Sequence, residues 1–219
     1  QEGGSLYQAQ FAYEQFGEWQ GTILRKTLNA DGTVIHDIDA PGNWDASVEI
    51  KKQASIADAA DTRNLWSAIP GSPYIGNWDN FKTENSDDIT ELFELFGFDI
   101  ADYHNATSYC STKGHVGDNG TSDDLEGLID FMRGIDCFDY NGDCNVKELR
   151  SHVLGDIYHS QLIEVGPPDA SIQFTGANEE AYFRATNNYQ SFMQKHATRR
   201  NVIYAGANSG VLHAINAET

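Results

Sequence analysis

The chain has 219 residues, of which 40% are hydrophobic and 11% aromatic, a composition that excludes a disordered chain. Its formal net charge of −19, from 33 acidic against 14 basic residues, disfavours binding to nucleic acid and to anionic membrane surfaces. No apolar run approaches the roughly 20 residues of a membrane span, so no membrane insertion is expected. The first residues show no signal-peptide pattern, and we expect any such peptide to be absent from this sequence.

The first 52 residues predict β structure. Apolar and polar side chains alternate over residues 6–28, as they do in half-buried strands. The dipeptide Asp31-Gly32 is typical of hairpin turns. We expect a loop around Trp44 to follow, and then a short strand at 46–50.

The middle of the chain predicts helices separated by irregular segments. Residues 63–66 indicate a strand that Pro70 and Pro73 end. Apolar residues at helical spacing then predict helices. The helical segments are 55–61, 86–98, 122–133 and 178–200. We expect Asn178 to cap the last of them.

The C-terminal part predicts more β structure. An apolar strand at 162–165 stops before Pro167, and residues 202–215 form a hairpin with its turn at 207–210. This hairpin leaves a sheet edge uncovered, an arrangement that natural proteins avoid. We therefore expect the chain to be part of a larger β structure.

An Asp-rich loop at 136–148 offers the most specific chemistry. Its residues with side-chain oxygens are Asp136, Asp139, Asn141, Asp143, Asn145 and Glu148. From Asp139 onward they fall on positions 1, 3, 5 and 7, with Glu148 at position 10, and Asp136 is a further ligand or the cap of the turn. Calcium takes six to eight such oxygens, so the loop predicts a Ca²⁺ site. An EF-hand is excluded, because the glycine is fourth rather than sixth and position 12 is Arg150. A solvated empty turn or another hard cation are the alternatives.

Two of the three cysteines, Cys137 and Cys144, bracket the core of this loop. A disulfide between them would shorten the unfolded loop and hold its ends together. Pairing of Cys110 with either one is the alternative.

No catalytic motif is present, because the sequence contains neither GxSxG nor HExxH. His152, Asp156 and His159 lie close in sequence, but such spacings arise readily by chance. We interpret these three residues as structural.

Several of these segments, taken in order, resemble the PilY-type family of type IV pilus tip-associated proteins. The matching positions are Arg133-Gly134, Arg150, Leu154 to Ile157, His159-Ser160, Tyr182, Tyr189, Phe192, Arg200, Gly206 to Asn208, Gly210 and Leu212 to Ala214. Ser209 departs from the family, which usually has an aspartate there.

The resemblance implies a non-catalytic bacterial protein, exported through the periplasm to the cell surface or pilus tip. It would act in pilus assembly, retraction control or adhesion, and calcium modulates some family members. Its expected partners are pilins or minor pilins, the remainder of the same polypeptide, or a protein that completes the open β edges.

The resemblance also implies an α+β fold. Mainly antiparallel β structure would come from an incomplete PilY- or quinoprotein-like β-propeller, with an inserted helical segment that carries the metal loop. The expected segments are a β-strand entry at 1–62, the helical insertion at 63–160, and a strand, helix and hairpin of one blade at 161–219.

Two other functions remain open at this point. The chain could be a subunit of an extracellular filament or surface assembly that another chain completes. The final hairpin also resembles a blade of PQQ-dependent dehydrogenases, which leaves a truncated quinoprotein-like oxidoreductase as a second alternative.

Overall fold

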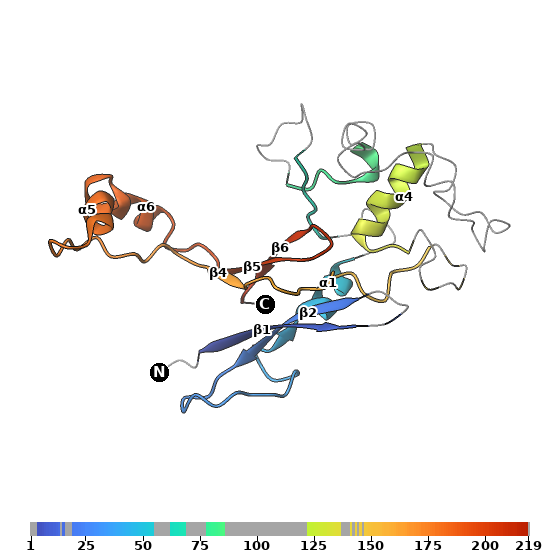
Figure 1. Ribbon diagram of the computed structural model, residues 1–219, viewed down its shortest axis with the longest axis horizontal. Helices are drawn as coiled ribbons and strands as arrows, with labels where there is room; N and C mark the ends of the chain where they lie inside the picture. Colours follow the sequence, from blue (N-terminus) through green and yellow to red (C-terminus); the bar gives the residue numbers. More distant parts are fainter. Residues whose placement is uncertain are drawn as a thin grey trace. The chain divides into compact units, whose positions relative to one another are not determined.

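The structure is a computed structural model that describes residues 4–13, 15, 19–54, 62–68, 78–85, 122–136, 141, 143, 145 and 147–218. The chain divides into two compact units (Figure 1). One comprises residues 1–46 and 155–219, and the other residues 47–154. The three segments expected from the sequence stay a prediction.

The first sheet confirms the N-terminal strands. β1 (Ser5–Ala12) pairs along its full length with β2 (Gln20–Thr27), and β2 pairs with the short β3 (Trp44–Asp45), in antiparallel order throughout. Successive side chains of a strand point to opposite faces of the sheet, and this directs the Ile23 side chain to the interior, where Ile23 is fully buried.

The predicted hairpin turn after β2 is also confirmed. The backbone N–H of Asn29 donates to the carbonyl of Thr33 over 2.8 Å, and Leu28 bridges Val34. Gly32 has a φ of +84°, which a glycine adopts without strain.

The strand predicted at 46–50 is wrong, because these residues begin the helix α1 (Ala46–Gln53). Val48 and Ile50 have high β propensity, but the two buried residues, Ala46 and Ala54, lie eight positions apart, close to two helical turns. The backbone N–H of Ala54 donates to the carbonyl of Ile50 over 3.1 Å and completes the last turn.

The second sheet confirms the C-terminal strands. β4 (Ile163–Val165), β5 (Val202–Gly206) and β6 (Leu212–Asn216) follow one another in antiparallel order. Ile203 is buried at the centre of this sheet. Gly210, with a φ of +82°, closes the turn between β5 and β6.

The single helix predicted at 178–200 is instead two helices, α5 (Glu179–Thr186) and α6 (Tyr189–Lys195). Asn188 breaks the helix because its φ is +59°, in the left-handed region that asparagine tolerates. Asn178 holds the N-cap position, but its side chain makes no capping hydrogen bond.

The segment at 155–160 lies against both sheets of its unit. A Cβ atom at Gly21 of β2 would lie 2.3 Å from the carbonyl oxygen of Gly155, so the two backbones touch. Asp156 pairs twice with Asn208 in the β5–β6 turn: its carboxylate accepts the Asn208 amide over 2.5 Å, and its carbonyl accepts the Asn208 N–H over 3.0 Å. Asp156 therefore connects this segment to the β5–β6 turn.

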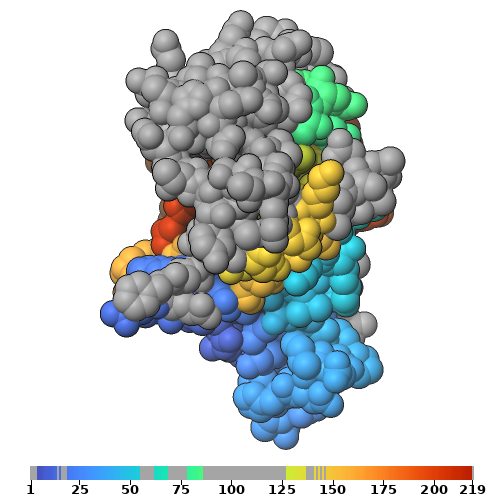
Figure 2. Space-filling view, turned by 90° about the vertical axis from the view of Figure 1, so that its right-hand side faces the viewer, coloured from blue at the N-terminus to red at the C-terminus, as the bar shows by residue number. Residues whose placement is uncertain are grey.

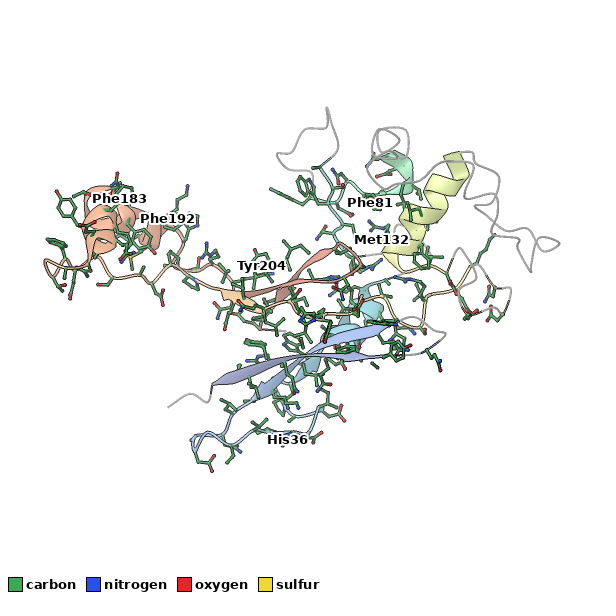
Figure 3. The ribbon with its side chains drawn as sticks, in the orientation of Figure 1. His36, Phe81, Met132, Phe183, Phe192 and Tyr204 are labelled. Atoms are coloured by element: carbon green, nitrogen blue, oxygen red, sulfur yellow. The ribbon has the colours of Figure 1, made fainter. Side chains whose placement is uncertain are left out.

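The other unit has a small core beside the helix α4 (Ser122–Arg133), which ends where the sequence predicts. Ile129 and Phe81 are buried there against Leu65, Leu128 and Met132 (Figure 3). The short 3₁₀ helix η2 (Thr83–Asn85) follows Phe81.

The strand predicted at 63–66 is wrong, because no strand pairs with it within the described residues. One backbone hydrogen bond, from the Phe81 N–H to the Leu65 carbonyl over 3.0 Å, and several side-chain bonds take the place of a partner strand. The Asn80 amide donates to the Ser67 carbonyl and accepts the Ser67 N–H, each over 2.8 Å, and Asp79 accepts the Leu65 N–H over 3.0 Å.

The α+β class with antiparallel sheets is thus confirmed. The described strands form two three-stranded sheets and no closed propeller. The helices predicted at 55–61 and 86–98 lie outside the described residues. Among the helices that the structure describes, none is long and apolar enough to cross a membrane.

Candidate metal centre

The Asp-rich loop starts where α4 ends. Gly134 adopts a φ of +104° directly after Arg133, and the next N–H groups bond back to the helix, from Gly134 to Phe131 over 3.0 Å and from Ile135 to Asp130 over 2.9 Å. A left-handed glycine of this kind ends a helix and turns the chain away from it.

The two ends of the loop are paired with each other. Ile135 bridges Leu149, Asp136 donates its N–H to the Glu148 carbonyl, and Arg150 donates its N–H to the Gly134 carbonyl, both over 2.8 Å. We call this pairing of 134–136 with 148–150 the loop neck. It fixes where the loop begins and ends on α4.

Inside the loop, two amides converge on one carboxylate. Asn141 donates its side-chain N–H to one oxygen of Glu148 over 2.6 Å, and Asn145 donates to the other oxygen over 2.9 Å. The carboxylate of Asp136 accepts the Asn141 backbone N–H over 3.4 Å. Four of the six predicted ligands are therefore brought together.

The fifth described residue, Asp143, takes part in a chain of side-chain turns. Asn141 accepts the Asp143 N–H over 3.0 Å, Asp143 accepts the Asn145 N–H over 2.8 Å, and Asn145 accepts the Lys147 N–H over 3.4 Å. Each side chain bonds the backbone two residues on, which curls the loop tightly.

Asp139, the sixth predicted ligand, lies outside the described residues, and so do Cys110, Cys137 and Cys144. Their roles as ligand and disulfide partners stay predictions. The described part of the chain contains no group of three His, Cys, Asp or Glu side chains that could hold a metal. In the loop, the amides of Asn141 and Asn145 stand beside the described carboxylates.

The chemistry of this loop fits a hard cation. Its described candidate ligands are all carboxylates or amides, which offer oxygen atoms to a metal, while soft metals prefer thiolate and imidazole. Asp136 is 2% exposed, whereas Asn141, Asp143 and Asn145 are exposed. The yellow part of the chain, to which the described residues of the loop belong, reaches the surface in Figure 2. The Arg150 guanidinium lies 4.0 Å from the centre of the Phe131 ring, stacked on α4.

On the other side of the helix end, Arg133 connects three segments. This side chain is 3% exposed, and it donates to the Asp79 carboxylate and the Phe81 carbonyl over 3.0 Å each, and to the Arg63 carbonyl over 3.3 Å. Lys82 forms a second ion pair with Asp79 over 2.9 Å.

Asp79 is held in its charged form. Partial burial raises the pKa of its carboxyl, but hydrogen bonds from Lys82, the Leu65 N–H and Arg133 outweigh that effect and hold the pKa below its usual 3.8. The sequence does not predict the ion pair of Asp79 with Arg133, because 54 residues separate the two and no local pattern marks them.

The chain is 33% identical over 124 residues to a protein described as "Type IV pilus biogenesis factor PilY1 homolog" from Xylella fastidiosa (strain Temecula1). The resemblance to the PilY-type family is confirmed. The aligned stretch is 55% of this chain but 9% of that PilY1 homolog, so the chain corresponds to a small part of a long protein. It matches no family model, and no solved structure is significantly similar to it.

Several residues at the end of α4 and around the loop are among the positions at which the chain resembles the PilY-type family. Arg133, Gly134, Arg150 and Asp156 belong to the residues that carry the PilY-type resemblance. In the structure they connect segments of the fold: Arg133 at the core, Gly134 and Arg150 at the loop neck, and Asp156 at the β5–β6 turn. None of these described contacts requires a substrate.

Proposed function

We propose that this chain is part of a PilY-like protein that works, without catalysis, in type IV pilus biogenesis or in adhesion at the bacterial surface. The observation that carries the proposal is the 33% identity over 124 residues to a PilY1-type pilus biogenesis factor. The protein would reach the surface through the periplasm and act at the pilus tip.

Location tests this proposal directly. Antibodies raised against the chain should label the ends of pili in immunogold electron microscopy of the bacterium that carries the gene. The chain should also appear in the fraction of sheared surface pili. Label confined to the cytoplasm would contradict the proposal.

The Asp-rich loop is the proposed calcium site of this protein. The loop neck fixes its two ends, Asp136 is buried at its base, and Asn141, Asn145 and Glu148 already meet. A bound cation would supply positive charge among these acidic side chains. Rotation of either amide would present its oxygen to the cation, and it would give up the hydrogen bond that this oxygen accepts from the backbone two residues on.

Calcium should then stabilise the folded chain by mass action. We expect the thermal midpoint to rise on addition of CaCl₂ and to return with chelator, with a smaller rise for MgCl₂. Asp139→Ala and Asp143→Ala should abolish the rise, whereas Asp39→Ala, in an exposed turn elsewhere, should keep it. A thermal midpoint that changes with neither calcium nor chelator would show that the loop is an empty turn.

The sheet edges support a protein partner. β1 and β6 are edge strands of their sheets, with no second partner strand among the described residues. An uncovered edge offers N–H and carbonyl groups to a further strand. The partner would be a pilin or minor pilin, or the remainder of the same polypeptide.

A further inference from the structure

Three aromatic side chains around α5 lie at the surface in a way that the proposed function does not explain. Phe174 is 51% exposed, Tyr182 is 56% exposed and Phe183 is 66% exposed. Together with Glu179 they line a hollow of about 440 Å³, which we call the α5 hollow. Figure 3 labels Phe183 on this helix.

The helix itself places three of the four lining residues side by side. Glu179, Tyr182 and Phe183 stand at positions i, i+3 and i+4 of α5, so they share one face. Phe174 comes from the preceding loop, with its ring centre 5.3 Å from that of Tyr182 and the two planes inclined by 59°. The two rings therefore pack against each other at an incline.

The loop that carries Phe174 is held in place by hydrogen bonds. The Asn178 side chain accepts the Thr175 N–H over 2.8 Å and donates to the Gln173 carbonyl over 3.0 Å. Arg184 of α5 donates to the Ser171 carbonyl over 2.8 Å. The asparagine expected to cap the helix thus fixes the loop instead, and the hollow is formed before any ligand arrives.

The lining of the hollow matches the chemistry of an organic cation. Aromatic rings present the negative face of their quadrupole to a cation, and a carboxylate adds a full negative charge. The one basic side chain of α5, Arg184, is held at the Ser171 carbonyl and is not part of this lining. We propose that the α5 hollow binds an alkylammonium group, such as a quaternary ammonium or a lysine side chain.

Choline and 3,3-dimethyl-1-butanol test this proposal as a pair, because they have nearly the same shape and differ in charge. Saturation-transfer NMR titrations on the 219-residue chain should show choline binding about tenfold more tightly than the neutral alcohol. A parallel titration with Nα-acetyl-lysine amide distinguishes a quaternary from a primary ammonium. The proposal is overturned if neither cation binds, or if the neutral alcohol binds as well as the cations.

Variants locate the binding. Tyr182→Ala should weaken cation binding about fivefold and Glu179→Gln about threefold, because one removes a ring and the other the charge. Glu180→Gln, with the same charge change outside the lining, and Phe192→Ala on α6 should leave binding unchanged. All four side chains are exposed, and circular dichroism should show each variant folded. Equal losses for Glu179→Gln and Glu180→Gln would mean that the cation is held by general charge and not by this hollow.

Discussion

Arg133 and Asp79 form the most buried ion pair that the structure describes. The guanidinium is almost fully buried and also bonds two backbone carbonyls, so it needs the carboxylate to offset the cost of burying its charge. Lys82 contacts the same carboxylate from a more exposed position, with 32% of its side chain accessible. The ion pair with Arg133 should therefore contribute more to the free energy of unfolding than the ion pair with Lys82.

Asp79→Asn should lower the free energy of unfolding by about 3 kcal/mol, because it leaves the Arg133 charge buried without its anion. Lys82→Gln should cost less than about 1 kcal/mol, as expected for a partly exposed pair. Urea denaturation measures both. Similar small losses for the two variants would show that Arg133 does not depend on Asp79.

The same carboxyl predicts a pH dependence. Because the pKa of Asp79 is below 3.8 in the folded chain, its contribution to stability is complete above the pKa of the unfolded chain, which is about 3.9. That contribution should be lost as the pH falls from about 4 through the lowered pKa. Asp79→Asn should show a smaller loss of stability over this range than the parent chain. Parallel pH profiles in urea denaturation would contradict the assignment.

Among the elements of the fold, the segment at 155–160 approaches the backbone of β2 closely on one side and the Ser209 side chain of the β5–β6 turn on the other. A Cβ atom at Gly155 would lie 2.6 Å from the Ser209 hydroxyl oxygen and 3.0 Å from its Cβ. A Cβ at Gly206 would meet its nearest neighbour at 3.4 Å, an ordinary contact. The two glycines should therefore respond differently to the same substitution.

Gly155→Ala should destabilise the fold by about 1 to 3 kcal/mol through overpacking. Adding Ser209→Gly should recover most of the loss, because it removes both atoms that clash. Gly206→Ala is the matched control and should change the thermal midpoint little. If Gly155→Ala melts like the parent chain, the Ser209 side chain does not lie against Gly155 as described.

Local patterns in the sequence predicted most of the elements but not their interruptions. The alternation before Thr27, the Asp31-Gly32 turn and the helix end at Arg133 all depend on neighbouring residues, and all three predictions are confirmed. The residues at 46–50 form a helix because tertiary burial of Ala46 outweighs the β propensity of Val48.

The contacts of the candidate site were harder to predict. The sequence named the oxygen-bearing residues of the loop, but it could not show that Asn141 and Asn145 meet at Glu148, or that the loop neck pairs Gly134 with Arg150. These contacts depend on how the chain folds back over the loop, which no local spacing specifies.

For the molecule as a whole, the outer edge of β6 is a place where a partner could add a strand, and a substitution there can test this. Across the β5–β6 hairpin, the Ala207 N–H donates to the Val211 carbonyl, and the Ala217 N–H donates to the Asn201 carbonyl. Hydrogen-bonded and non-hydrogen-bonded pairs alternate along an antiparallel ladder, so Ala214, opposite Tyr204, is in a non-hydrogen-bonded pair and its N–H points to the outer edge. Ala214→Pro removes this N–H without removing a bond to β5.

In a deletion strain carrying the full-length gene, Ala214→Pro should fail to restore surface pili, while Ala214→Ser should restore them. The thermal midpoint of the purified chain should be similar for both variants. Full restoration by Ala214→Pro would exclude strand addition at this edge.

We propose that the chain is part of a PilY-like factor of pilus biogenesis. Counting surface pili by electron microscopy, in a strain from which the gene is deleted, tests it most directly. We predict that surface pili are lost and that the full-length gene restores them. Pili of normal number and normal twitching motility in the deletion strain would contradict the claim.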